Sequence, residues 1–195
     1  DSIVGIHRIP ELTSIDVLPG GGLRIGALVS HATLATDSAV LAAYTGVADA
    51  SAIVGSHATR ANGTLGGNVM NASPAMDTGA PLLCHGAVAV LVGPGGERRV
   101  ALSDLWTGPG RTSAAPDELL VAVELEPAAA RPGSAYVRLQ YRRQMEIAVV
   151  GVGATVELDD DGAVASARVA ISALSPVIER VADADFLYAL GGLGG

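Results

Sequence analysis

The sequence predicts an α+β fold in which most strands pair antiparallel. Three features lead to this expectation: short runs of alternating apolar residues, alanine- and leucine-rich runs of helical character, and turn signals between neighbouring strands. Hydrophobic residues make up 49% of the 195 residues and aromatic residues only 3%, so aliphatic side chains must fill the core. Charged residues are too few, at 16%, for a disordered chain.

A strand and two helices are expected first. Residues 22–30 alternate apolar with smaller or polar side chains, as a half-buried strand does. Ser30 and Thr33 offer hydroxyl N-caps to a helix that continues to Tyr44, and an alanine-rich run predicts a second helix over 47–54. The polar segment that follows, 56–81, has no period and is expected to be irregular.

Regular structure is expected to return with a short helix over 80–86 and a strand over 88–92. The turn Gly93-Pro94-Gly95-Gly96 would join that strand to a hairpin partner over 98–102. A further strand is predicted over 119–125.

A linker over 127–133 predicts a boundary between one domain of residues 1–128 and a second of residues 134–195. The Asp159 to Gly162 run is a strong hairpin signal, because an Asp-Gly turn tolerates positive φ. The second domain is expected to hold strands over 135–142, 148–158 and 164–174, followed by a helix over 179–190.

Charge and cysteine content exclude several classes of function. The net charge of −8 disfavours a nucleic-acid partner, since phosphate backbones are held by clustered Lys and Arg. The single cysteine, Cys84, excludes a metal cage of several cysteines within this chain. No membrane span is expected, because prolines and glycines interrupt the one long uncharged stretch, 78–96. The absence of a signal pattern predicts an intracellular, cytoplasmic location.

The segment 56–77 is the part of the sequence most typical of a functional site. Long aperiodic segments inside compact chains are usually functional or disordered, and Leu65, Val69 and Met70 would pin this one to a core. Its glycines would let backbone N–H groups approach the oxygens of a diphosphate. The pattern is neither a Walker A nor a Rossmann loop, so a purely structural glycine turn remains an alternative.

The run R-x-N-G-T-L-G-G-N-x-x-N-A-S-P-x-x-D over 60–77 resembles the second flavin-binding loop of the flavoprotein subunits of molybdenum hydroxylases. That family, which includes aerobic carbon monoxide dehydrogenases and xanthine dehydrogenases, usually shows G-T-I-G-G-N followed by A-S-P and an Asp. The match covers nearly the whole chain. It includes the strand at 22–27, the P-x-L-x-x-x-G-A helix at 81–87, R-T at 111–112, E-L-L at 118–120 and Y-x-R at 136–138.

The resemblance implies a vanillyl-alcohol-oxidase/PCMH-type FAD-binding subdomain, with a mixed, mostly antiparallel sheet. A small antiparallel sheet plus a helix, the start of the carbon monoxide dehydrogenase flavoprotein-like C-terminal domain, would follow. The FAD-binding positions that it implies are Gly63, Thr64, Leu65, Gly66, Gly67, Asn68, Ser73, Asp77, Leu120 and Arg138.

Several of these positions also have simpler interpretations. Asp77 could cap the following helix, Leu120 could be ordinary core, and Arg138 could be a solvated strand residue. Arg138 also departs from the family, which usually has Lys near the pyrimidine end of the flavin. A cation there would stabilise negative charge on a reduced flavin.

The function implied is electron transfer rather than oxidation of a primary substrate. FAD in this subunit would take electrons from [2Fe–2S] clusters in a small partner subunit and pass them to a quinone or NAD. A large partner subunit would hold the molybdenum-pterin cofactor. The family also implies a dimer of heterotrimers and, besides a free cytoplasmic state, peripheral attachment at the inner face of the membrane.

The family's first flavin loop, A-G-G-T/H-x-L, has no counterpart in this sequence. We therefore expect a fragment that lacks the N-terminal subdomain and binds FAD weakly by itself. Two other classes remain open. One is a free-standing vanillyl-alcohol-oxidase-type flavin oxidase, which the Cys84-His85 pair keeps possible as a covalent tether. The other is a non-enzymatic scaffold subunit that has lost FAD.

Overall fold

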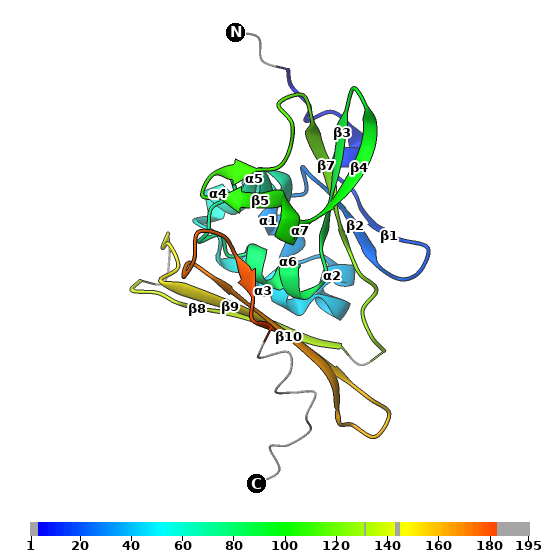
Figure 1. The fold of residues 1–195 in the computed structure, drawn as a ribbon, viewed down its shortest axis with the longest axis vertical. Helices are drawn as coiled ribbons and strands as arrows, with labels where there is room; N and C mark the ends of the chain where they lie inside the picture. The colour runs from blue at the N-terminus through cyan, green and yellow to red at the C-terminus, as the bar shows by residue number, and fades with distance from the viewer. Residues whose placement is uncertain (1–3, 131, 143–144, 183–195) are drawn as a thin grey trace.

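The computed structural model describes residues 4–130, 132–142 and 145–182. A layer of short helices lies between two antiparallel sheets, with the larger sheet formed by the N-terminal two thirds of the chain (Figure 1). The described helices and sheets share one buried cluster of mostly aliphatic side chains. This arrangement confirms the predicted α+β fold with antiparallel strands.

The larger sheet has five strands in the order β1-β2-β7-β3-β4, and every neighbouring pair is antiparallel. The predicted strands at 88–92 and 119–125 are present in it, and the one at 98–102 lies at 96–101. Of the strand predicted over 22–30, only 23–26 is a strand, and a turn follows it. Its members are β1 (Ile15–Val17), β2 (Leu23–Gly26), β3 (Val88–Gly93), β4 (Gly96–Ala101) and β7 (Leu119–Leu125).

The helices of the middle layer are short, and side-chain caps begin several of them. Ser30 and Asp37 cap α1 and α2, while Ser56 and Thr64 cap α4 and α5. The helices are η1 (Pro10–Leu12), α1 (His31–Leu34), α2 (Ser38–Ala43), α3 (Thr45–Ile53), α4 (His57–Asn62), α5 (Leu65–Asn71), α6 (Gly79–Cys84) and α7 (Leu102–Leu105). A small two-stranded sheet, β5 (Trp106–Gly108) with β6 (Arg111–Thr112), follows α7.

Two expectations about this layer were wrong. The helix predicted from Ser30 to Tyr44 is broken into α1 and α2, because Asp37 accepts from the amides of Ala39 and Val40 and starts a new helix. The segment 56–81 is largely helical rather than irregular. Helices of six or seven residues are too short to show a helical period of apolar residues. The hydroxyl caps at their first turns are the sequence feature that marks them instead.

The second sheet has four strands in the order β11-β10-β9-β8, and it packs against α3 and α6. It consists of β8 (Pro132–Leu139), β9 (Val150–Leu158), β10 (Val164–Ser172) and β11 (Glu179–Arg180). The hairpin at 159–162 is confirmed, with the Asp159 amide donating to the Ala163 carbonyl oxygen at 2.9 Å. The predicted helix over 179–190 begins instead as a strand, and residues 183–190 lie outside the described residues.

The domain boundary near residue 128 stays a prediction. Residues from both sides of it, such as Leu83 and Tyr136, belong to the same buried cluster. Among the described residues, no helix is long and apolar enough to cross a membrane.

Candidate functional site

The start of α5 is fastened to the residues that follow β2. The Leu65 amide donates to the Val29 carbonyl oxygen at 2.9 Å, and the Gly66 amide donates to the Ala27 carbonyl oxygen at 2.8 Å. Thr64 caps the helix by accepting from the Gly67 amide at 3.1 Å. These bonds hold the glycine segment rigidly along one end of the larger sheet.

The backbone amides in this segment are not bare, which corrects the sequence-based argument for a phosphate cradle. Besides the three amides above, the Gly63 amide donates to the Thr59 carbonyl oxygen at 2.6 Å, and the Asn68 amide donates to the Thr64 carbonyl oxygen at 3.0 Å. The first amides of a helix have no partner within it, and here those of α5 are bonded to the segment after β2 and to the Thr64 hydroxyl. That these residues bind a flavin stays a prediction.

Close backbone packing explains Gly66. A Cβ atom at this position would lie 2.6 Å from the Ala27 Cβ and 2.7 Å from the Ala27 carbonyl oxygen. Since neither atom is the end of a flexible side chain, the backbone of α5 or of the Ala27 segment would have to move. Only glycine lets the helix approach the sheet this closely.

We predict that Gly66→Ala lowers the free energy of unfolding by about 1–3 kcal/mol, the usual range for an overpacked core position. Urea unfolding followed by circular dichroism would measure the loss. Gly95→Ala is the matched control, because a Cβ there has nothing within 4 Å. Equal stability of the two variants would show that α5 does not depend on this contact.

An apolar cleft lies beside the glycine segment. Thr64, Gly66, Gly67 and Leu120, all predicted flavin-binding positions, line this cleft of about 320 Å³. Its remaining walls come from Ile6, Ala27, Leu28, Met70, Glu118 and Leu119. The volume falls in the range of roughly 300–1,000 Å³ typical of small-molecule sites. Leu120 is therefore both a buried core residue and part of the cleft wall.

The other residues predicted on this segment support it from within. The Leu65 side chain is fully buried in the core. Asn68 accepts through Oδ1 from the Thr78 hydroxyl at 2.7 Å, which ties α5 to the start of α6. The Gly63 carbonyl oxygen accepts from the His31 amide, and the Ser73 hydroxyl accepts from the Ala75 amide at 3.3 Å.

Asp77 and Arg138 form a second site, a buried polar cluster. Arg138 Nη1 lies 2.8 Å from Asp77 Oδ2, and the two side chains are only 2% and 9% exposed. Tyr136 Oη donates to Asp77 Oδ1 at 2.9 Å. The capping role considered for Asp77 and the solvated position considered for Arg138 are therefore both wrong.

Burial and hydrogen bonding act against each other in this cluster. Burial raises the pKa of the Asp77 carboxyl, while the hydrogen bond from Tyr136 and the charge of Arg138 lower it. Burial and the neighbouring Asp77 raise the pKa of the Tyr136 hydroxyl. Tyr136 therefore acts as a hydrogen-bond donor near neutral pH.

Sequence reasoning quoted Tyr136 but gave it no role. Tyr136 and Arg138 are two residues apart on β8, so both side chains lie on the face of the strand that points toward Asp77. That alternation was visible in the sequence. Their common partner was not, because Asp77 is about 60 residues away along the chain and only the fold brings it close.

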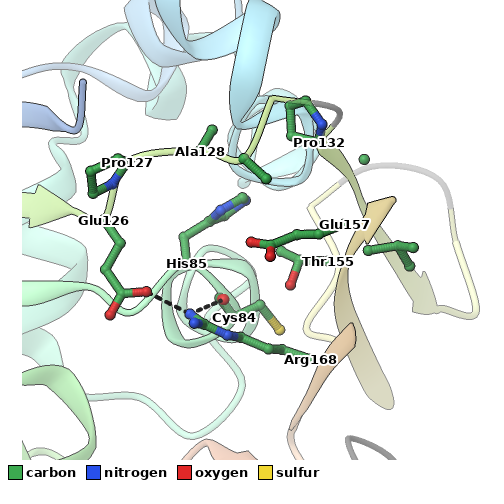
Figure 2. Close-up of a pocket in the computed structure, with 12 residues that line it drawn as sticks. Cys84, His85, Glu126, Pro127, Ala128, Pro132, Thr155, Glu157 and Arg168 are labelled. Atoms are coloured by element: carbon green, nitrogen blue, oxygen red, sulfur yellow. Dashed lines mark hydrogen bonds and ion pairs between the residues drawn. The ribbon is translucent and has the colours of Figure 1, made fainter. Parts of the chain in front are cut away.

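The Cys84-His85 pair lies elsewhere, at the end of α6 beside β9 and β10. Figure 2 shows these residues with Glu126 and Arg168 around a cavity of about 20 Å³, roughly the size of one water molecule. Arg168 Nη1 donates to Glu126 Oε2 at 2.7 Å and to the Cys84 carbonyl oxygen at 3.3 Å. Cys84 and His85 are both buried, and the cavity beside them is too small for a flavin ring.

Comparisons with known proteins identify the family to which this fold belongs. The family described as "FAD binding domain in molybdopterin dehydrogenase" matches residues 1–128. The xanthine dehydrogenase FAD-binding subunit of Escherichia coli O157:H7 is 31% identical over 184 residues, covering 94% of this chain and 63% of that protein.

Comparison with solved structures supports the same family assignment. A chain of the carbon monoxide dehydrogenase from Hydrogenophaga pseudoflava superposes with a TM-score of 0.83 at 28% identity, covering 90% of this chain and 60% of that one. A chain of quinoline 2-oxidoreductase from Pseudomonas putida 86 gives a TM-score of 0.84 at 26% identity, covering 94% and 62%.

These matches place the fold among FAD-binding domains. It belongs to the family of FAD-binding domains in molybdopterin dehydrogenases. It spans about three fifths of the length of these relatives.

Proposed function

We propose that this chain forms part of the flavoprotein subunit of a molybdenum hydroxylase complex, and that FAD binds along the apolar cleft. In this proposal the flavin takes electrons from [2Fe–2S] clusters of a small partner subunit and passes them to a quinone or NAD. A large partner subunit carries the molybdenum-pterin cofactor, and the complex assembles as a dimer of heterotrimers in the cytoplasm.

One observation carries the proposal. Residues far apart in the sequence, namely Thr64, Gly66 and Gly67 in one segment and Leu120 in another, line the same cleft. The family resemblance had singled out these positions independently. An apolar cleft with a few polar groups at its edge suits a flat ring system whose polar atoms need only a few partners.

Two features of the chain suit the cofactor, one in the cleft and one in the buried Asp77–Arg138 cluster, whose residues are not among those that line the cleft. The cleft offers Leu120 and Met70 as apolar walls and the Thr64 side chain as a polar group. The Arg138 guanidinium is held in place, and its Nη2 is buried without a hydrogen-bond partner among the described residues. Buried donors are normally paired, so this one fits an acceptor oxygen of a bound ligand. FAD would supply the redox chemistry, and the protein would supply binding, orientation and charge.

A substitution at Gly67 tests whether the cleft binds FAD. Gly67 is exposed, lines the cleft, and a Cβ there would meet only the Thr64 hydroxyl, at 3.0 Å. Gly67→Leu in the intact protein is therefore expected to fill the cleft and weaken FAD binding at least tenfold, about 1.4 kcal/mol. Titration followed by flavin fluorescence would measure the dissociation constant.

Gly95→Leu is the control, because Gly95 lies in the β3–β4 turn with no atoms within 4 Å of a Cβ. It should bind FAD as the parent protein does. Unchanged FAD binding by Gly67→Leu would place the cofactor elsewhere. Analysis of the native complex for molybdenum, iron and FAD would test the proposed partners.

A further inference from the structure

The Arg138 guanidinium is braced from several directions. Its Nη1 donates to Asp77 Oδ2 at 2.8 Å, and its Nε donates to Gln140 Oε1 at 2.7 Å. The carbonyl oxygen of Glu146 lies 3.4 Å from Nη1. Only Nη2 is without a partner within the part of the chain that the structure describes. Because these bonds fix Nε and Nη1, the planar guanidinium group holds Nη2 in one direction.

Asp77 is fixed in the same way. Each carboxylate oxygen accepts one bond, Oδ1 from the Tyr136 hydroxyl at 2.9 Å and Oδ2 from Arg138. The tyrosine ring is itself held, because it lies in the core at 5% exposure and Gly151 on the neighbouring strand makes room for its hydroxyl. A Cβ at Gly151 would collide with Tyr136 Oη and Ser172 Oγ.

We propose that Tyr136 is a positioning residue for the flavin: it holds Asp77, and through Asp77 it aims the free Nη2 of Arg138 at an acceptor oxygen of the cofactor. This inference rests on the proposed function. Without the phenol donor, Asp77 Oδ1 is left buried and unpaired, so the carboxylate turns away from its present position to find another donor. Arg138 then loses its fixed anchor, and its charge no longer favours the reduced flavin to the same degree.

The test uses the intact protein with FAD bound and compares Tyr136→Phe with Tyr44→Phe. Tyr44 is a matched control, since it too is buried and donates from Oη, at 2.7 Å to the Glu126 carbonyl oxygen, away from this cluster. Both variants lose one hydroxyl, so both lose some thermal stability. Tyr136→Phe alone is expected to bind the reduced flavin about tenfold more weakly relative to the oxidised one. That corresponds to a fall of about 30 mV in the two-electron midpoint potential.

A second variant, Asp77→Asn, covers the case in which Tyr136→Phe fails to fold. It keeps an acceptor for Arg138 but removes the negative charge that offsets the guanidinium, so its midpoint potential is expected to rise. A midpoint potential that stays at the parental value in the variants that fold and bind FAD would overturn the positioning role. Equal shifts in Tyr136→Phe and Tyr44→Phe would overturn it too. Absence of FAD from the parent protein would instead refute the proposed function, and this inference with it.

Discussion

The folded protein is expected to become markedly less stable between pH 6.5 and pH 4, because two buried histidines stay neutral in the folded state where they would be protonated in the unfolded chain. Burial lowers the pKa of His31 from 6.5 to about 4. The pKa of His85 is also lowered to about 4, chiefly by burial and further by the charge of Arg168, while Glu126 opposes the shift. Both side chains are at least nine-tenths buried.

The sign follows from proton binding. Between the two pKa values the unfolded chain binds more protons than the folded one, so the free energy of unfolding falls as the pH falls. The stability is complete above pH 6.5 and the loss ends near pH 4. Each histidine contributes roughly 3 kcal/mol over that window, and together they approach the whole stability of many domains.

Urea unfolding at a series of pH values would measure this slope, and His31→Leu and His85→Leu should each remove about half of it. His57→Leu is the control, because it removes an exposed imidazole rather than a buried one. If the dependence of unfolding free energy on pH is unchanged in the double variant His31→Leu/His85→Leu, other groups cause the acid sensitivity.

The strands and their turns could be predicted from the sequence because each carries its own local signal. The Asp-Gly turn at 161–162 appears in the structure as expected, and the alternating run at 22–30 forms a strand over its first part, Leu23–Gly26. Apolar alternation and turn-forming residues act over a few positions, so these strands and turns can be predicted without knowing the rest of the fold.

The helices α4 and α5 could not be predicted in the same way. Their stability comes from the caps at Ser56 and Thr64, and for α5 also from the bonds of Leu65 and Gly66 to the segment after β2. Isolated helices of this length are unstable in water, so tertiary contacts decide them. The same limit explains the site: resemblance singled out Asp77 and Arg138 separately, but their pairing depends on β8 packing near α6.

The Asp77–Arg138 pair leads to the second large prediction. Removal of one partner leaves the other charge buried at less than 10% side-chain exposure, where water cannot replace the lost ligand. Asp77→Ala or Arg138→Ala is therefore expected to lower the free energy of unfolding by about 3–5 kcal/mol. Arg142→Ala is the control, since its side chain is 68% exposed and its pair with Glu146 contributes at most about 1 kcal/mol.

The double variant Asp77→Leu/Arg138→Leu separates the pair itself from the penalty for an unpaired charge. Because both charges leave together, its loss should be smaller than the sum of the two single losses. If each single variant costs less than about 1 kcal/mol, water reaches the cluster and the brace around Arg138 is loose. A large cost for each single substitution, with a small cost for the double one, means that the fold holds this cation only because Asp77 is ionised. The charge offered to a flavin then depends on Asp77 as much as on Arg138.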